Sequence, residues 1–173
     1  MLAETQEYYN IGSWLSKMLN HHRCSKFLTT KKLQVNHGEI WYCDLGYNVG
    51  TEKNKIRPVL VLSNNKVNQA EKVVIVSITD AKGKLNARDL PLQDSWYLLY
   101  SNTTDDNKKI YPGRLIRKGN TPYEFLEKDS IVQCEEIRAV SKARLDAARK
   151  CIGTLDSKDF NNIKQKLIRT YNL

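Results

Sequence analysis

The sequence predicts a mainly β domain, a small barrel or curled sheet with helices at one edge. Three runs rich in β-branched and aromatic residues, 38–45, 56–62 and 72–79, come early in the chain and are typical of strands. Near the C-terminus the apolar residues instead recur at steps of three and four, which is the period of a helix. The length of 173 residues suits a single domain.

The second strand and the loop before it stand out among these elements. Val59 to Leu62 form a continuous apolar run, which indicates a strand buried on both faces. The loop 46–55, about ten residues long, exceeds a tight hairpin, and loops of that length often carry function. Gly, Asn and Lys residues make this loop polar.

A helix is expected ahead of the first strand, within an N-terminal extension over residues 1–37. Apolar side chains recur there at helical spacing: Tyr8, Ile11, Leu15, Met18 and Leu19. We expect this stripe to pack on the barrel or on a second subunit. Contact with a membrane or a partner protein is the alternative, although the polar face has few cations for a membrane role.

The second half of the chain predicts one more strand, 131–140, followed by two helices. Ser141 is expected to cap a helix over 142–150 that ends at Gly153. Asp156 or Ser157 is expected to cap a last helix, whose apolar face consists of Phe160, Ile163, Leu167, Ile168 and Tyr171. The stretch before the strand, about 85–128, predicts an elaborated hairpin or a short helix plus a strand.

Charge and composition narrow the function. The net charge of +9 favours a polyanionic partner, because Lys and Arg release counterions from phosphates. No apolar run is long enough to span a membrane, and the N-terminus lacks a signal core, so we expect a cytoplasmic protein without membrane contact. The four isolated cysteines are expected to be reduced and mostly buried, which makes a zinc site improbable.

Arg57 is the strongest candidate for chemistry. It stands at the start of the apolar strand, and Pro58 restricts it to an extended backbone, which fixes where its side chain leaves the chain. A guanidinium stays charged and presents a planar fork of donors suited to phosphate. A surface salt bridge is an equally common role for such a residue.

Five blocks in order give the chain a family resemblance. They are GEIW at 38–41, GTEK at 50–53, RPVLV at 57–61, VVIVSIT at 73–79 and DSIVQCEEIRAV at 129–140. Together they resemble the MazF/PemK toxins of bacterial toxin–antitoxin systems, which are small endoribonucleases. The resemblance implies an SH3-like small barrel, MazF/CcdB-like, over 38–173, with an insertion at about 85–128, a C-terminal helix and an extra N-terminal helix.

The same resemblance implies a chemistry that needs no metal or cofactor. The 2′-hydroxyl of RNA attacks the adjacent phosphorus and leaves 2′,3′-cyclic phosphate and 5′-hydroxyl ends. Arg57 and Thr79 match the catalytic pair of the family, and Glu52 either orients Arg57 or accepts the proton. A pair of histidines is disfavoured, because Thr51 stands where one branch of the family has a histidine and Gln133 stands where it has an arginine.

Substrate contacts and partners follow as expectations. The candidate RNA-binding residues are Thr51, Lys53, Lys55, Asn64, Lys82 and Lys84, with Tyr47 and Asn48 as further possible base contacts and Glu135 as a weaker acidic candidate. The resemblance implies a homodimer that binds single-stranded RNA across its interface and a cognate antitoxin that inserts an acidic segment there. Two alternatives stay open: a CcdB-like toxin acting on DNA gyrase, and a catalytically silent RNA-binding relative.

Overall fold

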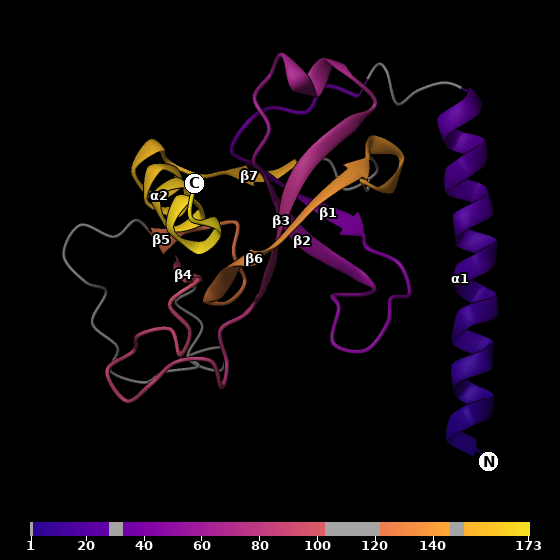
Figure 1. Ribbon diagram of the computed structural model, residues 1–173, viewed down its shortest axis with the longest axis horizontal. Helices are drawn as coiled ribbons and strands as arrows, with labels where there is room; N and C mark the ends of the chain where they lie inside the picture. Colours follow the sequence, from indigo (N-terminus) through magenta and orange to yellow (C-terminus); the bar gives the residue numbers. More distant parts are fainter. Residues whose placement is uncertain (1, 28–32, 103–121, 146–150) are drawn as a thin grey trace.

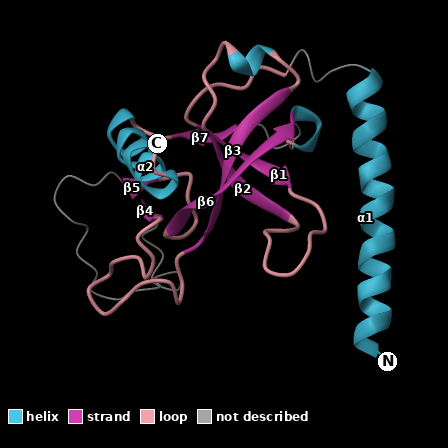
Figure 2. Cartoon of the chain, viewed as in Figure 1, coloured by secondary structure: helices cyan, strands magenta, loops and turns pink. Residues whose placement is uncertain are grey.

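The computed structural model describes residues 2–27, 33–102, 122–145 and 151–173 (Figure 1). Within these ranges the chain forms one curled seven-stranded sheet with strand order β5-β4-β6-β3-β2-β1-β7, and two long helices lie on either side of it (Figure 2). The strands are β1 (Glu39–Asp44), β2 (Ile56–Val61), β3 (Lys72–Asp80), β4 (Trp96–Ser101), β5 (Pro122–Tyr123), β6 (Ser130–Ser141) and β7 (Cys151–Thr154). The helices are α1 (Leu2–Phe27) and α2 (Ser157–Tyr171), with short 3-10 turns η2 (Val67–Gln69) and η4 (Lys142–Arg144). The predicted fold class, mainly β with helices at the N- and C-terminal ends, is confirmed.

All neighbouring strands run antiparallel except β4 and β5. The register of β3 against β6 shifts once: Ile137 lies opposite Val76, whereas Val132 lies opposite Ile78. Residues 133–136 of β6 therefore bulge beside Ser77. Bulges bend a strand and re-aim its side chains, and they are common next to functional sites.

The two faces of the sheet carry separate apolar cores. One contains Ile40, Leu60 and Val76 and is covered by α2 through Phe160 and Ile163. The other contains Trp41, Val59, Ile75 and Val140. Because successive side chains of a strand alternate between faces, β2 contributes to both cores. Val59, Leu60 and Val61 are fully buried, which confirms the strand predicted to be covered on both faces.

The C-terminal helix is α2, and it begins where its cap was predicted. The Asp156 carboxylate accepts from the Asp159 N–H at 2.7 Å, and Asn172 ends the helix in the left-handed conformation. The Tyr97 and Tyr123 hydroxyls both donate to the Asp159 carboxylate, at 2.6 and 2.7 Å. The helix is thus tied to the sheet by polar as well as apolar contacts.

The helix predicted over 142–150 is corrected in part. Ser141 does cap a turn, because its hydroxyl accepts from the Ala143 N–H, but the turn ends at Arg144 and residues 146–150 lie outside the described ranges. Gly153 was expected to end that helix and instead belongs to β7, which pairs with β1. The Phe125 ring lies where a Cβ at residue 153 would stand, so close packing against β7 explains why this position is a glycine.

The insertion adds an edge to the sheet. In its described part, β4 pairs antiparallel with β6, and the two-residue β5 runs parallel to β4. Residues 86–94 form turns, with Leu85 and Pro91 bridged, and the described part contains no helix. The basic residues of the insertion lie in 103–121, outside the described ranges: Lys108, Lys109, Arg114, Arg117 and Lys118.

The N-terminal helix α1 forms as predicted but turns a neighbouring face to the barrel, the one that carries Glu7, Trp14 and His21. Tyr8, Leu15 and Leu19 of the apolar stripe are exposed, by 75%, 48% and 61%. The residues that contact the barrel are polar or aromatic, so of the two expected partners of the stripe the barrel was wrong, and a second subunit stays a prediction. No helix in the described ranges has an apolar stretch long enough to cross a bilayer.

Candidate active site beside β2 and β3

Arg57 lies at the start of β2, opposite Cys43 of β1, and is half-buried. Its Nε donates to the Asn54 carbonyl oxygen at 2.8 Å, so the loop holds the plane of the guanidinium. Among the described residues, no acceptor bonds its terminal nitrogens. The side chain therefore keeps its two outer donors available for an anion.

Thr79 is brought to Arg57 by the register of the strands. β2 and β3 pair at Val59 and Ser77, and two residues further toward the same end the register reaches Arg57 and Thr79. Residues two apart in a strand share a face, so both side chains leave the same side of the sheet. The two residues that the family resemblance singled out thus lie toward the same end of neighbouring strands and on one face of the sheet.

Ser77 is a residue that sequence reasoning missed. It is fully buried on the face that carries Arg57 and Thr79, and its hydroxyl has no hydrogen-bond partner among the described residues. Gln133, at the start of the neighbouring bulge, has an unpartnered buried side-chain oxygen as well. A serine within the apolar run VVIVSIT was the only signal in the sequence. Buried unpaired polar groups are uncommon and need an explanation.

Glu52, one of whose two expected roles was to orient Arg57, contacts Arg138 instead. Its carboxylate lies 3.5 Å from the Arg138 guanidinium of β6 and is 58% exposed. The loop thus reaches from β1 across to β6, on the side of the sheet where the Arg57 side chain bonds Asn54. Arg138, which the sequence reasoning did not single out, is therefore a second arginine associated with the loop.

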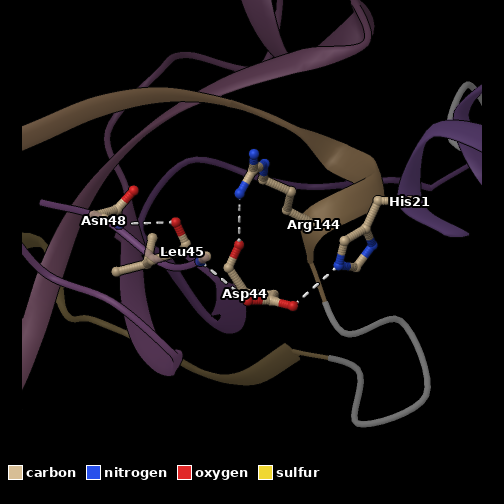
Figure 3. Close-up of polar contacts among 6 residues, drawn as sticks. His21, Asp44, Leu45, Asn48 and Arg144 are labelled. Atoms are coloured by element: carbon tan, nitrogen blue, oxygen red, sulfur yellow. Dashed lines mark hydrogen bonds and ion pairs between the residues drawn. The ribbon is translucent and has the colours of Figure 1, made fainter. Parts of the chain in front are cut away.

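The neck of the loop is closed by backbone hydrogen bonds. The Leu45 N–H donates to the Lys55 carbonyl and the Lys55 N–H to the Gly46 carbonyl, at 3.0 and 2.8 Å. Lys55 adopts the left-handed conformation, with φ of 64°, which is unusual for a residue other than glycine. The Asn48 amide donates to the Leu45 carbonyl (Figure 3) and also to the Lys53 carbonyl, so it braces the loop internally. Asn48 is accordingly a poor candidate for reading a base.

The other residues predicted to bind RNA lie in three places. Lys82 and Lys84 follow Thr79 in the turn after β3, near the Arg57 end of the strands, and the Lys84 ammonium donates to the Asp80 carbonyl at 2.7 Å. Thr51 and Lys53 lie in the loop itself. Asn64 lies beyond the opposite end of β2, where its side-chain oxygen accepts from two N–H groups at the start of η2. The structure therefore does not bring Asn64 together with Arg57.

Glu135, the weaker acidic candidate, and two of the histidines contact groups away from Arg57 and Thr79. Glu135 accepts from the Trp96 indole N–H at 2.6 Å, within the bulge of β6. His37 contacts the Leu62 carbonyl at the far end of β2, and His21 contacts Asp44 at 3.1 Å. None of the described histidines bonds Arg57 or Thr79.

Comparisons with known proteins place the chain among related sequences and folds. A family profile described as PemK-like, MazF-like toxin of type II toxin-antitoxin system matches residues 36–171. Endoribonuclease MazF of Staphylococcus saprophyticus is 25% identical over 128 residues, which cover 74% of this chain and 86% of the relative. A solved endoribonuclease in complex with its cognate antitoxin, from a mycobacterial species, aligns with a TM-score of 0.52 and 20% identity over 80% of this chain and 96% of that one.

The curled sheet, with an arginine and a threonine at one end of two buried strands and lysines around them, defines a small β protein with a site suited to a phosphodiester. Because the family match covers most of the chain, we can name the family. The chain belongs to the PemK-like, MazF-like toxins of type II toxin–antitoxin systems.

Proposed function

We propose that this MazF-like toxin is an endoribonuclease that cuts single-stranded RNA at specific sequences and thereby inhibits translation. The cut leaves 2′,3′-cyclic phosphate and 5′-hydroxyl ends and needs no metal. The observation that carries the proposal is the shared face and matched register of Arg57 and Thr79, at the polar end of two buried strands.

To catalyse this reaction, the protein must orient the 2′-hydroxyl in line with the leaving oxygen and accept the proton of that hydroxyl. It must also stabilise the charge that develops on the phosphorane and protonate the leaving oxygen. Arg57 suits the third of these tasks, because a guanidinium donates two parallel hydrogen bonds to phosphate oxygens. Its attachment to the Asn54 carbonyl fixes the fork before the substrate arrives. Preorganised donors of this kind lower the barrier without reorganising during the reaction.

Thr79 supplies a neutral hydroxyl beside this cation. Its strand is hydrogen-bonded to β6 at this position, opposite Ile131, so the backbone that carries the hydroxyl is rigid. The hydroxyl can donate to a phosphate oxygen or accept a proton in passage. Arg57 and Thr79 together thus provide three donors for the charge that develops on the phosphorane.

Of the two roles left open for Glu52, we favour acceptance of the 2′-hydroxyl proton. Orientation of Arg57 is already provided by the Asn54 carbonyl, and Glu52 instead contacts Arg138. An exposed carboxylate on a loop can approach the substrate once RNA is bound, because catalytic hydrogen bonds often form only in the complex.

The test is cleavage of a mixed RNA pool by purified protein in excess chelator, followed by mapping of cut sites and analysis of the new ends. We expect cuts at one short sequence, with cyclic phosphate and 5′-hydroxyl ends. Arg57→Ala should lower the rate by about 10²–10³ and leave folding intact. Arg169→Ala on α2 is the matched control and should cut normally. Absence of any cut by the unaltered protein in chelator would refute the proposal.

We also propose that the toxin acts as a cytoplasmic homodimer, with RNA bound across the interface and an antitoxin occupying the same groove. The net charge of +9 supports an acidic partner segment as well as RNA. Light scattering coupled to size-exclusion chromatography tests the dimer. A monomer at micromolar concentration that still cuts RNA would contradict it.

A further inference from the structure

A cleft of about 460 Å³ lies between α1 and the neck of the β1–β2 loop. Asn10, Trp14 and Lys17 line it from the helix, and Tyr47 and Lys55 are among the residues that line it from the loop. The family match begins at residue 36, so one wall of the cleft comes from outside the matched region. Its volume falls within the range of about 300–1,000 Å³ that is usual for small-ligand sites.

The helix that forms this wall is fixed at three levels. Near its start, the Tyr47 hydroxyl donates to the Glu7 carboxylate at 3.1 Å. Two turns later, the Trp14 ring lies against Gly46, so closely that a Cβ there would approach it to 2.7 Å. Two turns later again, His21 lies 3.1 Å from the Asp44 carboxylate (Figure 3). Residues seven apart share a helix face, so the cleft is a preformed feature of this face.

Arg144 reinforces the middle level. Its guanidinium carbon lies 5.2 Å from the centre of the Trp14 ring, within cation–π range, and its Nη1 donates to the Asp44 carbonyl at 3.2 Å (Figure 3). The turn that carries Arg144 therefore braces both walls of the cleft. A rigid site loses less conformational entropy when a ligand binds.

The lining is cationic. Lys17 and Lys55 both face no anionic partner among the described residues. The Asp44 carboxylate also borders the cleft, but it is occupied by His21 and by the Gly46 N–H at 3.1 Å. Two unpaired ammonium groups in one cleft attract an anion, and phosphate is the anion that lysines commonly bind.

The lining also offers a flat apolar surface and hydrogen-bonding groups. The half-buried Tyr47 ring is held in place through its hydroxyl, and a fixed aromatic ring is the usual platform for a nucleobase. The Asn10 side-chain oxygen accepts from Gln6 at 3.2 Å, which leaves the amide N–H₂ free for a base edge. An acidic peptide would use the lysines but not the ring or the amide.

From this combination we propose that the cleft binds one nucleotide of the RNA substrate, flanking the step that is cut; this rests on the ribonuclease function proposed above. Ile56 borders the cleft, whereas Arg57, the next residue of β2, leaves the opposite face. The bound nucleotide is therefore not the one at the scissile bond, and the strand passes around the edge of the loop. The N-terminal helix thus extends the recognised sequence.

The experiment uses full-length toxin and a fluorescent RNA that contains its cut site, made uncleavable by a 2′-O-methyl group on the attacking nucleotide. Lys17→Glu should weaken binding about 5- to 10-fold and reduce the salt dependence of log K by about 0.7, the loss of one single-strand phosphate contact. Lys164→Glu on α2, an exposed lysine of equal charge, should leave both unchanged. Circular dichroism checks that α1 stays helical in each variant.

Photocrosslinking locates the nucleotide. An RNA series with 5-iodouridine at successive positions should crosslink to Tyr47 or Trp14 from one position outside the cut dinucleotide, and Lys17→Glu should reduce that product. Equal binding by Lys17→Glu and Lys164→Glu together with no crosslink to either ring would overturn the inference. A competition with poly-L-glutamate tests an acidic peptide as the occupant. If poly-L-glutamate displaces the uncleavable RNA from unaltered toxin but not from Lys17→Glu, and no crosslink forms, the cleft binds an acidic peptide. That result would overturn the inference as well.

The two proposals fail separately. If the unaltered protein cuts no RNA in chelator, the proposed ribonuclease function is refuted. Binding and crosslinking of the uncleavable RNA still test whether the cleft holds a nucleotide. If the protein cuts RNA and the Lys17 and Lys164 variants bind alike without a crosslink, only the cleft inference falls.

Discussion

The Trp14 ring of α1 lies directly on Gly46, the first residue of the β1–β2 loop, with no room for a side chain between them: a Cβ at residue 46 would stand 2.7 Å from the ring. Gly46 also has a φ of +95°, a conformation that other residues rarely adopt. One glycine thus both turns the chain into the functional loop and seats the N-terminal helix. This double role makes the helix and the loop sensitive to the same substitution.

Gly46→Ala should therefore release α1 from the barrel and lower stability by about 2–4 kcal/mol, through backbone strain and steric overlap. The matched control is Gly50→Ala in the same loop, where φ is +60° and no atom lies within 4 Å of the added Cβ. Its cost should be about 1 kcal/mol from backbone strain alone. Hydrogen exchange of α1 and urea unfolding provide the measurements. Equal costs for the two variants would contradict the contact with Trp14.

Thr79→Val should separate chemistry from binding. The change keeps the shape of a β-branched side chain but removes the hydroxyl, and the position is half-buried in β3. We expect kcat to fall by about 10²–10³, with affinity for an uncleavable RNA within about threefold of the unaltered protein. Single-turnover cleavage measures the rate of the chemical step. An unchanged rate would remove Thr79 from the site.

Ser77→Ala should not destabilise the protein. The Ser77 hydroxyl is buried without a partner in the described part of the chain, so its removal relieves a desolvation cost of about 1–3 kcal/mol and leaves a small void in exchange. The contrasting variant is Ser63→Ala, since the Ser63 hydroxyl donates to Asn68 and accepts from the Val74 N–H at 2.9 Å. That change should cost about 1–2 kcal/mol. Thermal unfolding compares the two, and a similar loss in both would show that Ser77 has a partner.

The buried thiols should make the protein less stable in alkali. Burial raises the pKa of both Cys43 and Cys134 from 9.0 to about 12. Above pH 9 the thiols of the unfolded chain lose protons that the folded chain retains, so the free energy of unfolding falls as pH rises. The loss from the two thiols should reach about 3 kcal/mol by pH 10, still below the range where the tyrosines of the unfolded chain ionise fully.

Urea unfolding between pH 8 and pH 10 measures this slope. The double variant Cys43→Ala/Cys134→Ala should be less stable throughout, because it leaves cavities, but should show a flatter pH dependence. Both thiols should also resist a thiol reagent in the folded protein at pH 8. A slope that the double variant does not reduce would assign the alkaline loss to other groups.

Much of the fold could be predicted because local chemistry specifies it. The apolar run Val59–Val61 has no polar side to expose, so it becomes a strand buried on both faces. Asp156 caps α2 because its short carboxylate reaches a free N–H at the helix start. The family blocks also made Arg57 and Thr79 the candidates for the site, since both stand in short motifs whose residues follow one another in the chain.

Other features depend on contacts that local sequence does not encode. The helix expected over 142–150 is only a short turn where the structure describes it, over Lys142–Arg144. Gly153, expected to end that helix, lies in β7, where the Phe125 ring from a distant segment packs against it. The apolar stripe of α1 was expected to pack on the barrel or on a second subunit, and its residues Tyr8, Leu15 and Leu19 are exposed in this chain. The barrel instead presents Asp44, Gly46 and Tyr47 to the helix. These residues contact the polar and aromatic face of α1.

The sequence by itself determined the strands, the capped C-terminal helix, the positive charge and the order of the family blocks, because each depends on residues close together in the chain. Only the tertiary structure decided that Arg57 and Thr79 share a face, that Glu52 contacts Arg138 and that α1 forms a cationic cleft with the loop. These relationships depend on strand register and on the surface available for packing. Both are set by residues far apart in the sequence, so periodicity and spacing do not reveal them.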